Sequence, residues 1–419
     1  MRIDLRYGEG TLPLESGPLS TMELIRPKAA VGFEDLSAEI DRVLMSPMGM
    51  DSLSSMVARE DTVAVVVEGP VLHTHASLML DTVLSILIGR VVDPEKVSVI
   101  VSPAEGGPTD LAEWDKRLGS PTSMDFSLTV HDPQRDDQLT EIGTTPTHSV
   151  PIHLNRRFAS ADFKIGIGAI IQSTFTGATG GRSAVLPGVA GVNTRARHLK
   201  LLAQTHSTVF DTTTPVCQNM NEAAQLSGLN FIVDTIEDWR GSVAEVVAGH
   251  PISPWVHGVS TAGTLANVPQ EQRFDIAIVS AGGLMGDLTL YTATEALHSG
   301  LKATRRDGVI VLVAECRKEV GPEGFLKGVT HFASEPEALS IVESEFEMGM
   351  ERALYLRRVL DSRRIIFCSK LRSSLVEDSL GCVSVSDAQE GLEVAQDMTK
   401  TRARIAAFAN GARTNPIVT

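Results

Sequence analysis

The hydrophobic positions of the chain follow two alternating patterns. Unbroken aliphatic runs, typical of strands buried on both faces of a parallel sheet, occur at residues 62–67, 97–101, 165–171, 274–279 and 309–314. Segments with helical spacing alternate with them, at residues 36–44, 78–88, 109–118 and 288–298. Further elements are expected as helices at 335–360 and 387–408, and as a strand at 231–233 between two helices within 221–248. This alternation predicts an α/β fold with doubly wound parallel sheets, in which ligands bind beyond the carboxyl ends of the strands.

The order of the segments indicates two α/β domains with parallel-type sheets. Residues 251–270 contain three prolines and two glycines and show little periodicity, as is typical of an interdomain connection. We therefore expect a first domain over residues 1–268 and a second over residues 272–399. The last helical segment is expected to return, over about residues 400–419, to the first domain.

Composition narrows the range of protein classes to which this chain can belong. Of the 419 residues, 42% are hydrophobic and 21% charged, as in ordinary globular proteins, and the net charge of −15 argues against nucleic-acid or anionic-membrane partners, which need a basic face. The four cysteines form no C-x-x-C pair, as expected in a reducing compartment. The N-terminus has no apolar signal-peptide core, and no apolar run approaches the roughly 18 residues of a membrane span. A cytoplasmic protein is the expectation.

Three loops follow predicted strands, at residues 68–76, 103–109 and 172–183, and are expected to meet at one edge of a parallel sheet. The third is rich in small residues, with the sequence TGATGG at 176–181. Glycine lets a ligand approach the backbone closely and adopts positive φ at little cost. The spacing matches neither the dinucleotide nor the P-loop pattern, so a ligand-binding loop and a plain surface loop both remain open.

Four segments, in this order, give the chain a resemblance to a known family. They are LRYGEGTL at 5–12, TGGRSAVLPGVAG at 179–191, SAGGLMGDLTLY at 280–291 and GVIVLVAECRKEVG at 308–321. With them the chain resembles the nickel-dependent lactate racemases almost from end to end. The resemblance implies two α/β domains with an active-site cleft between them. It also implies a nickel-pincer nucleotide, a pyridinium mononucleotide that holds nickel through sulfur and carbon and shuttles hydride at a 2-hydroxy acid.

Several positions depart from the family pattern. A typical member ties the cofactor through a thioamide to a lysine just after the Gly-Gly pair, where this chain has Arg182 and Ser183. The resemblance therefore implies a cofactor bound without a covalent link. The two histidines that usually act as general bases fall at Ser173 and near Glu105. The family's Asp-x-Thr-Arg loop is replaced by residues 69–75.

The resemblance assigns roles to the remaining candidates, each beside a plainer alternative. His198 is the expected nickel ligand, since imidazole suits that metal, or else a histidine on a helix surface. Glu105 could act as a base if burial raised its pKa, together with His73 or His75, unless all three are ordinary surface groups. Arg182 suits a phosphate or a carboxylate, or a structural salt bridge. The expected cofactor contacts are Gly69, Thr179, Gly180, Gly181, Ser183, Pro187, Gly188, Asp287 and Tyr291.

The predicted function is racemisation or epimerisation of a 2-hydroxy acid through hydride transfer to a non-covalently bound nickel-pincer nucleotide. The expected partners are the hydroxy-acid substrate and the enzymes that mature the cofactor. One alternative is a homologue without catalysis that binds a nucleotide or an acidic metabolite. Another is a metal-assisted hydrolase or lyase that uses His73, His75 and Glu105.

Overall fold

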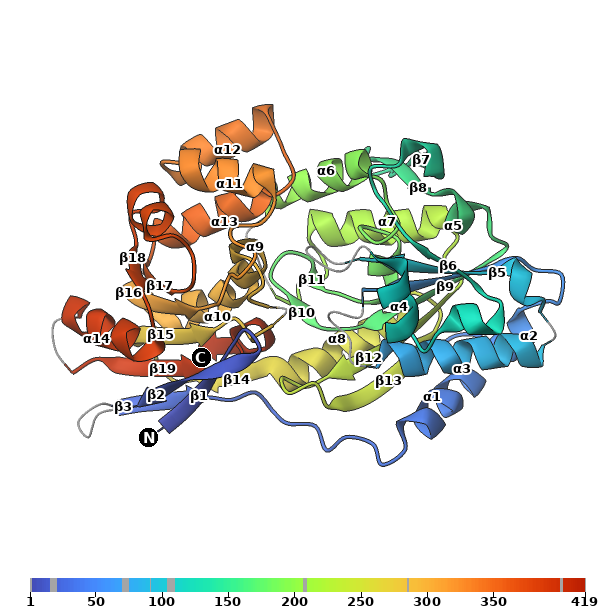
Figure 1. Cartoon of the computed structure of the whole chain (residues 1–419), viewed down its shortest axis with the longest axis horizontal. Helices are drawn as coiled ribbons and strands as arrows, with labels where there is room; N and C mark the ends of the chain where they lie inside the picture. The colour runs from blue at the N-terminus through green and yellow to red at the C-terminus, as the bar shows by residue number, and fades with distance from the viewer. Residues whose placement is uncertain are drawn as a thin grey trace. The chain divides into compact units, whose positions relative to one another are not determined.

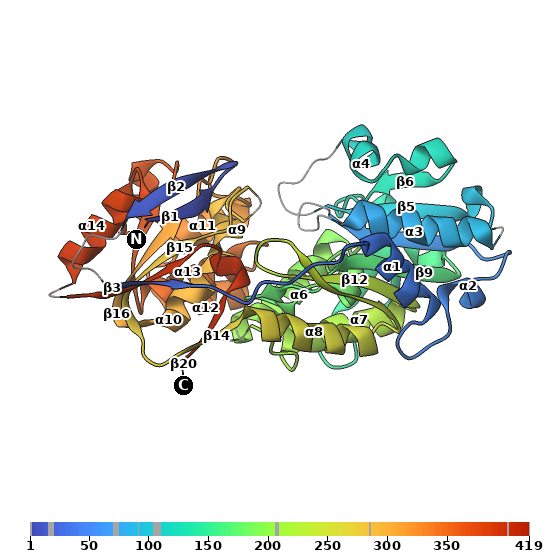
Figure 2. The ribbon, with the colours of Figure 1, turned by 90° about the horizontal axis from the view of Figure 1, so that it is seen from below.

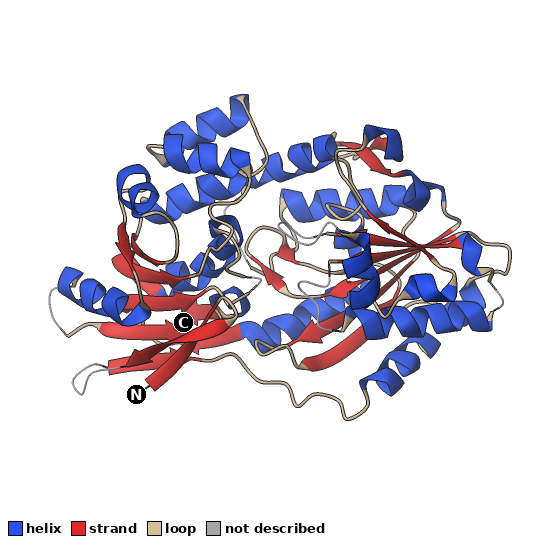
Figure 3. Cartoon of the chain, viewed as in Figure 1, coloured by secondary structure: helices blue, strands red, loops and turns tan. Residues whose placement is uncertain are grey.

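The computed structural model describes residues 2–15, 21–69, 75–90, 92–103, 110–205, 209–284, 286–399 and 402–418. The chain divides into two compact units (Figure 1). We call the one formed by Ala29–Leu201 and Ser207–Thr264 the central unit. The other, formed by Met1–Lys28, Leu202–His206 and Leu265–Thr419, is the terminal unit. In each unit helices flank a sheet (Figure 3), which confirms the predicted two-domain α/β class.

The central unit is built on a six-stranded sheet in the order β13-β12-β9-β4-β5-β6. The strands are β4 (Val63–Glu68), β5 (Val97–Ser102), β6 (Ser127–Val130), β9 (Phe163–Ala169), β12 (Phe231–Glu237) and β13 (Val243–Gly249). All neighbours from β12 to β6 run parallel, and only β13 is antiparallel. The unalternating aliphatic runs of the sequence therefore predicted β4, β5 and β9 correctly.

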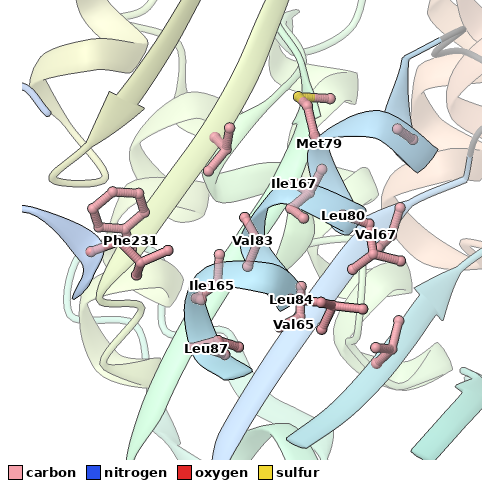
Figure 4. Close-up of a cluster of buried hydrophobic side chains, with 14 of the residues drawn as sticks. Val65, Val67, Met79, Leu80, Val83, Leu84, Leu87, Ile165, Ile167 and Phe231 are labelled. Atoms are coloured by element: carbon pink, nitrogen blue, oxygen red, sulfur yellow. The ribbon is translucent and has the colours of Figure 1, made fainter. Parts of the chain in front are cut away.

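Helices cover both faces of this sheet (Figure 1). On one face lie α1 (Leu36–Met45) and α3 (Ala76–Gly89), and on the other lie α5 (Arg156–Ser160), α7 (Pro215–Ser227) and a 3-10 turn at Gly181–Ala184. Alternate residues of β4 and β9 pack against α3 in the cluster drawn in Figure 4, which includes Val65, Val67, Met79, Leu80, Val83, Leu84, Leu87, Ile165, Ile167 and Phe231. Each such side chain contributes about 1.5–3 kcal/mol on burial.

The terminal unit contains a second six-stranded sheet, in the order β18-β17-β16-β15-β19-β3, with every neighbouring pair parallel. Its strands are β3 (Thr21–Ile25), β15 (Phe274–Ser280), β16 (Thr304–Val313), β17 (Arg364–Cys368), β18 (Val383–Val385) and β19 (Arg404–Phe408). The helices of this unit include α9 (Leu290–Ala293), α10 (Leu297–Ala303), α11 (Glu323–His331), α12 (Glu335–Ser344), α13 (Met350–Leu360) and α14 (Ala388–Met398).

The start of the chain belongs to the terminal unit, so the expectation that residues 1–28 form part of the first domain is wrong. Strand β3 pairs with β19 at the edge of the second sheet. The hairpin of β1 (Arg2–Tyr7) and β2 (Gly10–Glu15) lies beside α14, as Figure 2 shows in blue and red. Ile3, Leu5 and Leu14 are buried in the same core as β15 and β16, and this burial holds the hairpin there.

Several other segments differ from the sequence prediction. Residues 335–360, expected as one helix, form α12 and α13 with a break at residues 345–349. Residues expected to be an interdomain connection form α8 (Ser253–Ala266) and β14 (Asn267–Gln270). Trp255, Val259, Ala262 and Ala266 give α8 a buried stripe, and Pro254 lies in its first turn, where proline is tolerated. Strand β13 replaces a predicted helix. The chain ends in β19 and β20 (Asn415–Val418) within the terminal unit, rather than in a helix that returns to the first domain.

The remaining elements are short or peripheral. They are α2 (Leu53–Met56), α4 (Leu111–Arg117), α6 (Val192–Lys200), β7 (Leu139–Thr144), β8 (Pro151–Asn155), β10 (Gln172–Ser173) and β11 (Gly177–Ala178). None of the helices in the described part of the chain combines the length and apolar character needed to span a membrane.

Candidate functional site

Two buried carboxyl groups flank a glycine near the carboxyl ends of β4, β9 and β12. Asp234 on β12 is paired with Gly168 on β9, and Glu68 ends the neighbouring strand β4. A Cβ atom on Gly168 would lie 2.9 Å from Glu68 Oε2 and 3.0 Å from Asp234 Oδ1. Glycine at this position therefore leaves the space that both carboxyl groups occupy.

The pKa values of both carboxyl groups are raised, so each holds its proton to a higher pH than usual. Burial raises the pKa of Glu68 to about 8. Burial, and then the charge of Glu68, raises the pKa of Asp234 well above its ordinary value. Neither residue was predicted from the sequence, although each is a carboxylate within or at the end of a buried strand.

Asp234 holds the glycine turn that follows β9. The main-chain N–H of Gly181 donates to Asp234 Oδ1 over 3.1 Å. Gly180 and Gly181 both have positive φ, +82° and +55°, which other residues rarely adopt. Thr179 Oγ1 donates to Ala169 O over 2.7 Å and so ties the turn to the end of β9.

Arg182 follows the turn and is almost fully buried, with 2% of its surface exposed. Its guanidinium carbon lies 3.5 Å from the centre of the Trp255 ring, and Trp255 Nε1 donates to Thr179 O over 2.9 Å. Within the described part of the chain, none of the three guanidinium nitrogens has a hydrogen-bond partner, and no carboxylate pairs with Arg182. Arg182 therefore forms no structural salt bridge with any of the described residues.

The neighbour of the guanidinium is a thiol. Cys217 lies on α7, which begins at the cap Thr214 and Pro215, and its Sγ lies 3.1 Å from Thr176 O and 3.3 Å from Asp211 O. Because the thiol proton faces those carbonyls, the sulfur offers Arg182 only a weak acceptor. Burial lowers the pKa of Arg182 to about 10, so the side chain keeps its charge at neutral pH.

His198, on α6, is fully buried, so the alternative of a surface histidine is wrong. Asn219 Nδ2 donates to His198 Nδ1 over 3.0 Å, and Thr145 Oγ1 donates to Asn219 Oδ1 over 2.8 Å. The main-chain N–H of Val150 donates to Thr145 Oγ1 over 3.0 Å. Burial, and then the charge of Arg182, lowers the pKa of His198 to about 3. The imidazole is therefore neutral, and its Nε2 has no partner among the described residues.

The imidazole of His198 can bind a metal through Nε2 once the side-chain amide of Asn219 rotates. With Asn219 donating to Nδ1, the ring proton is on Nε2. A half-turn of the Asn219 amide would place the proton on Nδ1 and leave a lone pair on Nε2, while Thr145 Oγ1 would accept from the amide instead. Within the described ranges, no three His, Cys, Asp or Glu side chains form a group that could hold a metal ion by themselves. Among these residues, His198 could therefore supply one imidazole ligand to a metal-bearing group whose other ligands come from elsewhere.

The remaining loop candidates have varied surroundings. His73 and Glu105 lie outside the described residues. His75 is the residue before α3, and its Nε2 lies 3.5 Å from Gly241 O. Ser173, where the resemblance implies a histidine, accepts hydrogen bonds at Oγ from the main-chain N–H groups of Phe175 and Thr176, each over 3.2 Å. Ser173 therefore shapes a turn.

The expected cofactor contacts near the turn also serve the fold. The N–H of Gly69 donates to Ser102 O over 2.8 Å. The carbonyls of Pro187 and Gly188 accept from the guanidinium of Arg195 over 2.9 and 2.6 Å. Ser183 Oγ is buried and has no hydrogen-bond partner among the described residues.

Asp287 and Tyr291 have partners within the terminal unit. Asp287 Oδ2 accepts from the N–H groups of Gly8, over 2.7 Å, and Glu315, over 3.2 Å. It thereby joins three of the four sequence segments that carry the family resemblance. Tyr291 donates through its hydroxyl to Glu351 Oε1 over 3.1 Å. Asp287 thus joins loops of the terminal unit, and Tyr291 joins α9 to α13.

Fold and site together define a two-domain α/β protein whose central unit carries a glycine turn, a buried arginine and a neutral, buried histidine. Two family models match the chain: the lactate racemase N-terminal domain over residues 7–209 and the lactate racemase C-terminal domain over residues 269–414. The chain belongs to the lactate racemase family.

Two individual relatives have low sequence identity to the chain but match it over most of its length. The chain is 23% identical to a lactate racemase of Thermoanaerobacterium thermosaccharolyticum, over 98% of this chain and 97% of the relative. It is 25% identical to a lactate racemase of Lactiplantibacillus plantarum over 77% of each chain.

Two solved structures share the fold. The lactate racemase apoprotein of T. thermosaccharolyticum aligns over 100% of both chains with a TM-score of 0.88 and 22% identity. A protein of Thermotoga maritima aligns over 91% of this chain and 98% of its own, with a TM-score of 0.71 and 13% identity. At these identities the structural comparisons show the fold alone.

Proposed function

We propose that this protein racemises or epimerises a 2-hydroxy acid with a nickel-pincer nucleotide that it binds without a covalent link. Family membership supports the reaction class. The observation that carries the proposal is His198, a neutral imidazole held at Nδ1 and buried in the same unit as the family's glycine turn. Ser183 stands where a tethering lysine is expected, and a hydroxyl forms no thioamide.

Each residue has a distinct role in this proposal. The chemistry that a bound nickel group would supply here is hydride transfer at C2 of the hydroxy acid, with a planar 2-oxo acid between the two enantiomers. His198 would bind the nickel through Nε2. Arg182 would meet a phosphate or a carboxylate, and Asp287 and Tyr291 would support cofactor contacts. Maturation enzymes would supply the cofactor.

In this proposal, residues other than His198 transfer the proton of the substrate hydroxyl. A histidine whose pKa is about 3 is a poor acceptor for the substrate hydroxyl proton near neutral pH, although it keeps its lone pair for a metal. In the proposal, Glu105 with His73 or His75 takes and returns that proton. These three residues follow β4 and β5, which lie side by side and parallel in the sheet.

Native mass spectrometry tests the proposal on protein produced together with cofactor-synthesising enzymes. We expect a nickel-containing nucleotide that dissociates on denaturation, that His198→Ala loses, and that accompanies interconversion of 2-hydroxy-acid enantiomers on a chiral column. Protein that binds a nucleotide but no nickel would favour the non-catalytic alternative. Protein that binds neither would overturn the proposal.

A further inference from the structure

Arg182 differs from the half-buried arginines of the described chain in having neither an ion pair nor a hydrogen bond to an oxygen, with only the weakly accepting Cys217 thiol as a polar neighbour. Arg352 forms an ion pair with Glu295, and Arg358 forms one with Glu335 and also donates to main-chain carbonyls. Arg363 donates to several carbonyls. Arg182 is more deeply buried than these side chains, yet all three of its nitrogens lack a hydrogen bond among the described residues.

This arrangement is costly without a ligand. A guanidinium carries five N–H donors, and burying an ionised group without a counter-ion or hydrogen bonds is strongly unfavourable. The nearby acid Asp234 uses Oδ1 to accept from Gly181 and shares the space over Gly168 with Glu68. Nothing among the described residues therefore supplies the negative charge that Arg182 lacks.

The neighbours of Arg182 leave its donors available. Trp255 lies against the guanidinium face at 3.5 Å, and stacking of this kind leaves the in-plane N–H groups free to bind a ligand. His198 is close enough for the charge of Arg182 to act on it, and in the present hydrogen-bond arrangement its Nε2 also carries a proton. Two buried donor groups thus lie near each other in the central unit.

We propose that Arg182 is the anchor of an oxyanion, so that a carboxylate or phosphate group of a bound ligand is the counter-ion of its buried guanidinium. The planar fork of arginine matches both groups through two parallel hydrogen bonds. In its choice of ligands the proposal rests on the function proposed above, where the candidates are a 2-hydroxy carboxylate and the phosphate of a pyridinium mononucleotide. An ionic anchor of this kind would hold a cofactor that Ser183 cannot tether.

The test uses the full-length apoprotein, so it depends on neither nickel nor racemisation. Thermal unfolding and calorimetric titration are measured at constant ionic strength with lactate, inorganic phosphate and nicotinamide mononucleotide. Lactamide and nicotinamide riboside are the matched ligands without the anionic group. We expect at least one anion to bind and to raise the melting temperature, while its analogue without the anionic group does neither.

The pattern of binding identifies the source of the oxyanion. Binding of phosphate and the mononucleotide, without lactate, assigns Arg182 to the cofactor phosphate, and binding of lactate alone assigns it to the substrate carboxylate. If none of the three anions binds, the proposal is overturned, whatever the outcome of the nickel experiment. Conversely, anion binding by a protein that never acquires nickel would support this inference while the racemase proposal fails.

Variants separate an anchor from a structural role. Arg182→Met should abolish the anion-induced shift and leave the melting temperature without ligand unchanged or higher, because an uncompensated buried charge is removed. Arg182→Lys keeps the charge but loses the fork, and should weaken anion binding about tenfold or more. If Arg182→Met does not fold, the Lys variant decides: unchanged affinity would overturn the proposal.

The chain offers a matched control. Arg240 also lies over a tryptophan, with its guanidinium carbon 4.9 Å from the ring centre of Trp239, but it is exposed. Arg240→Met removes a stacked cation from the same unit and should leave anion binding unchanged. Retention of the anion-induced shift in Arg182→Met, or its loss in Arg240→Met, would contradict the inference.

Discussion

The N–H of Gly181 donates to Oδ1 of Asp234 over 3.1 Å, and this hydrogen bond fastens the glycine turn to the centre of the sheet. Asp234 is fully buried, and its other oxygen, Oδ2, has no hydrogen-bond partner among the described residues. The position of Arg182, the next residue, depends on this attachment. A carboxyl group that is costly to bury thus sets the geometry of the candidate site.

Asp234→Asn should retain the turn, because the amide oxygen can still accept from Gly181. Asp234→Ala removes the acceptor and should lower the free energy of unfolding by about 1–3 kcal/mol, the cost of a buried donor without a partner. Urea unfolding of the two variants at neutral pH measures the difference. Equal destabilisation by Asn and Ala would show that the hydrogen bond to Gly181 does not hold the turn.

Glu68 makes the stability of the protein depend on pH. The carboxyl group keeps its proton up to about pH 8 in the folded state, whereas in the unfolded chain it ionises near 4.5. The unfolded state thus binds fewer protons between these values, so the stabilising contribution is complete below about pH 4.5 and is lost as the pH rises toward and through 8.

The glutamine of Glu68→Gln cannot ionise, so this variant should not lose stability in this way as the pH rises. Relative to the wild type, its free energy of unfolding should rise between pH 5 and pH 8, by at most about 1.4 kcal/mol per pH unit. Denaturant titrations across this range measure the trend, with the exposed Glu34→Gln as control. Parallel pH profiles for wild type and Glu68→Gln would refute the assignment.

The space over Gly168 should not tolerate a methyl group. Gly168→Ala would bring Cβ to 2.9 Å from the Glu68 carboxyl, within a core where extra volume usually costs about 1–3 kcal/mol. Gly89, the exposed last residue of α3, has no atom within 4 Å of the corresponding position, so Gly89→Ala should be neutral or stabilising by up to about 1 kcal/mol. Thermal unfolding of both variants checks the contrast, and equal effects would contradict it.

Local sequence predicted the strands β4, β5 and β9 because their aliphatic runs need no knowledge of distant contacts. It failed for β13, which is a strand through its pairing with β12, and for β3, whose sheet is decided by β19 nearly four hundred residues away. At the site, residue type indicated only that Gly180 and Gly181 can adopt positive φ, and the structure shows that both do.

The environment of the site residues could not be predicted in the same way. The burial of Arg182 depends on Trp255, which lies in a segment first interpreted as a linker. The environment of His198 depends on Asn219 and Thr145, which are 74 residues apart in the sequence. Asp234 was visible within an aliphatic strand, but only the pairing of β12 with β9 places it beside the glycine turn.

Asn219 determines which ring nitrogen of His198 carries the proton. Because Thr145 donates to Oδ1, the amide nitrogen faces His198 Nδ1, and we expect the apoprotein to hold the proton on Nε2. In Asn219→Asp the carboxylate can only accept, so the proton should move to Nδ1 and the pKa of His198 should rise from about 3 toward its ordinary value. Nitrogen NMR of histidine-labelled protein distinguishes the two tautomers, with the exposed His331 as an internal reference.

The same variants connect the tautomer to metal binding. If His198 binds nickel through Nε2, Asn219→Asp should retain the metal, because it leaves Nε2 with a lone pair and Nδ1 with a hydrogen-bond partner. Asn219→Leu removes that partner and should lower nickel retention by about 10- to 100-fold, as seen for other hydrogen-bond partners of metal ligands. Elemental analysis after dialysis measures retention. A Leu variant that keeps as much nickel as the Asp variant would show that Asn219 does not position His198 for the metal.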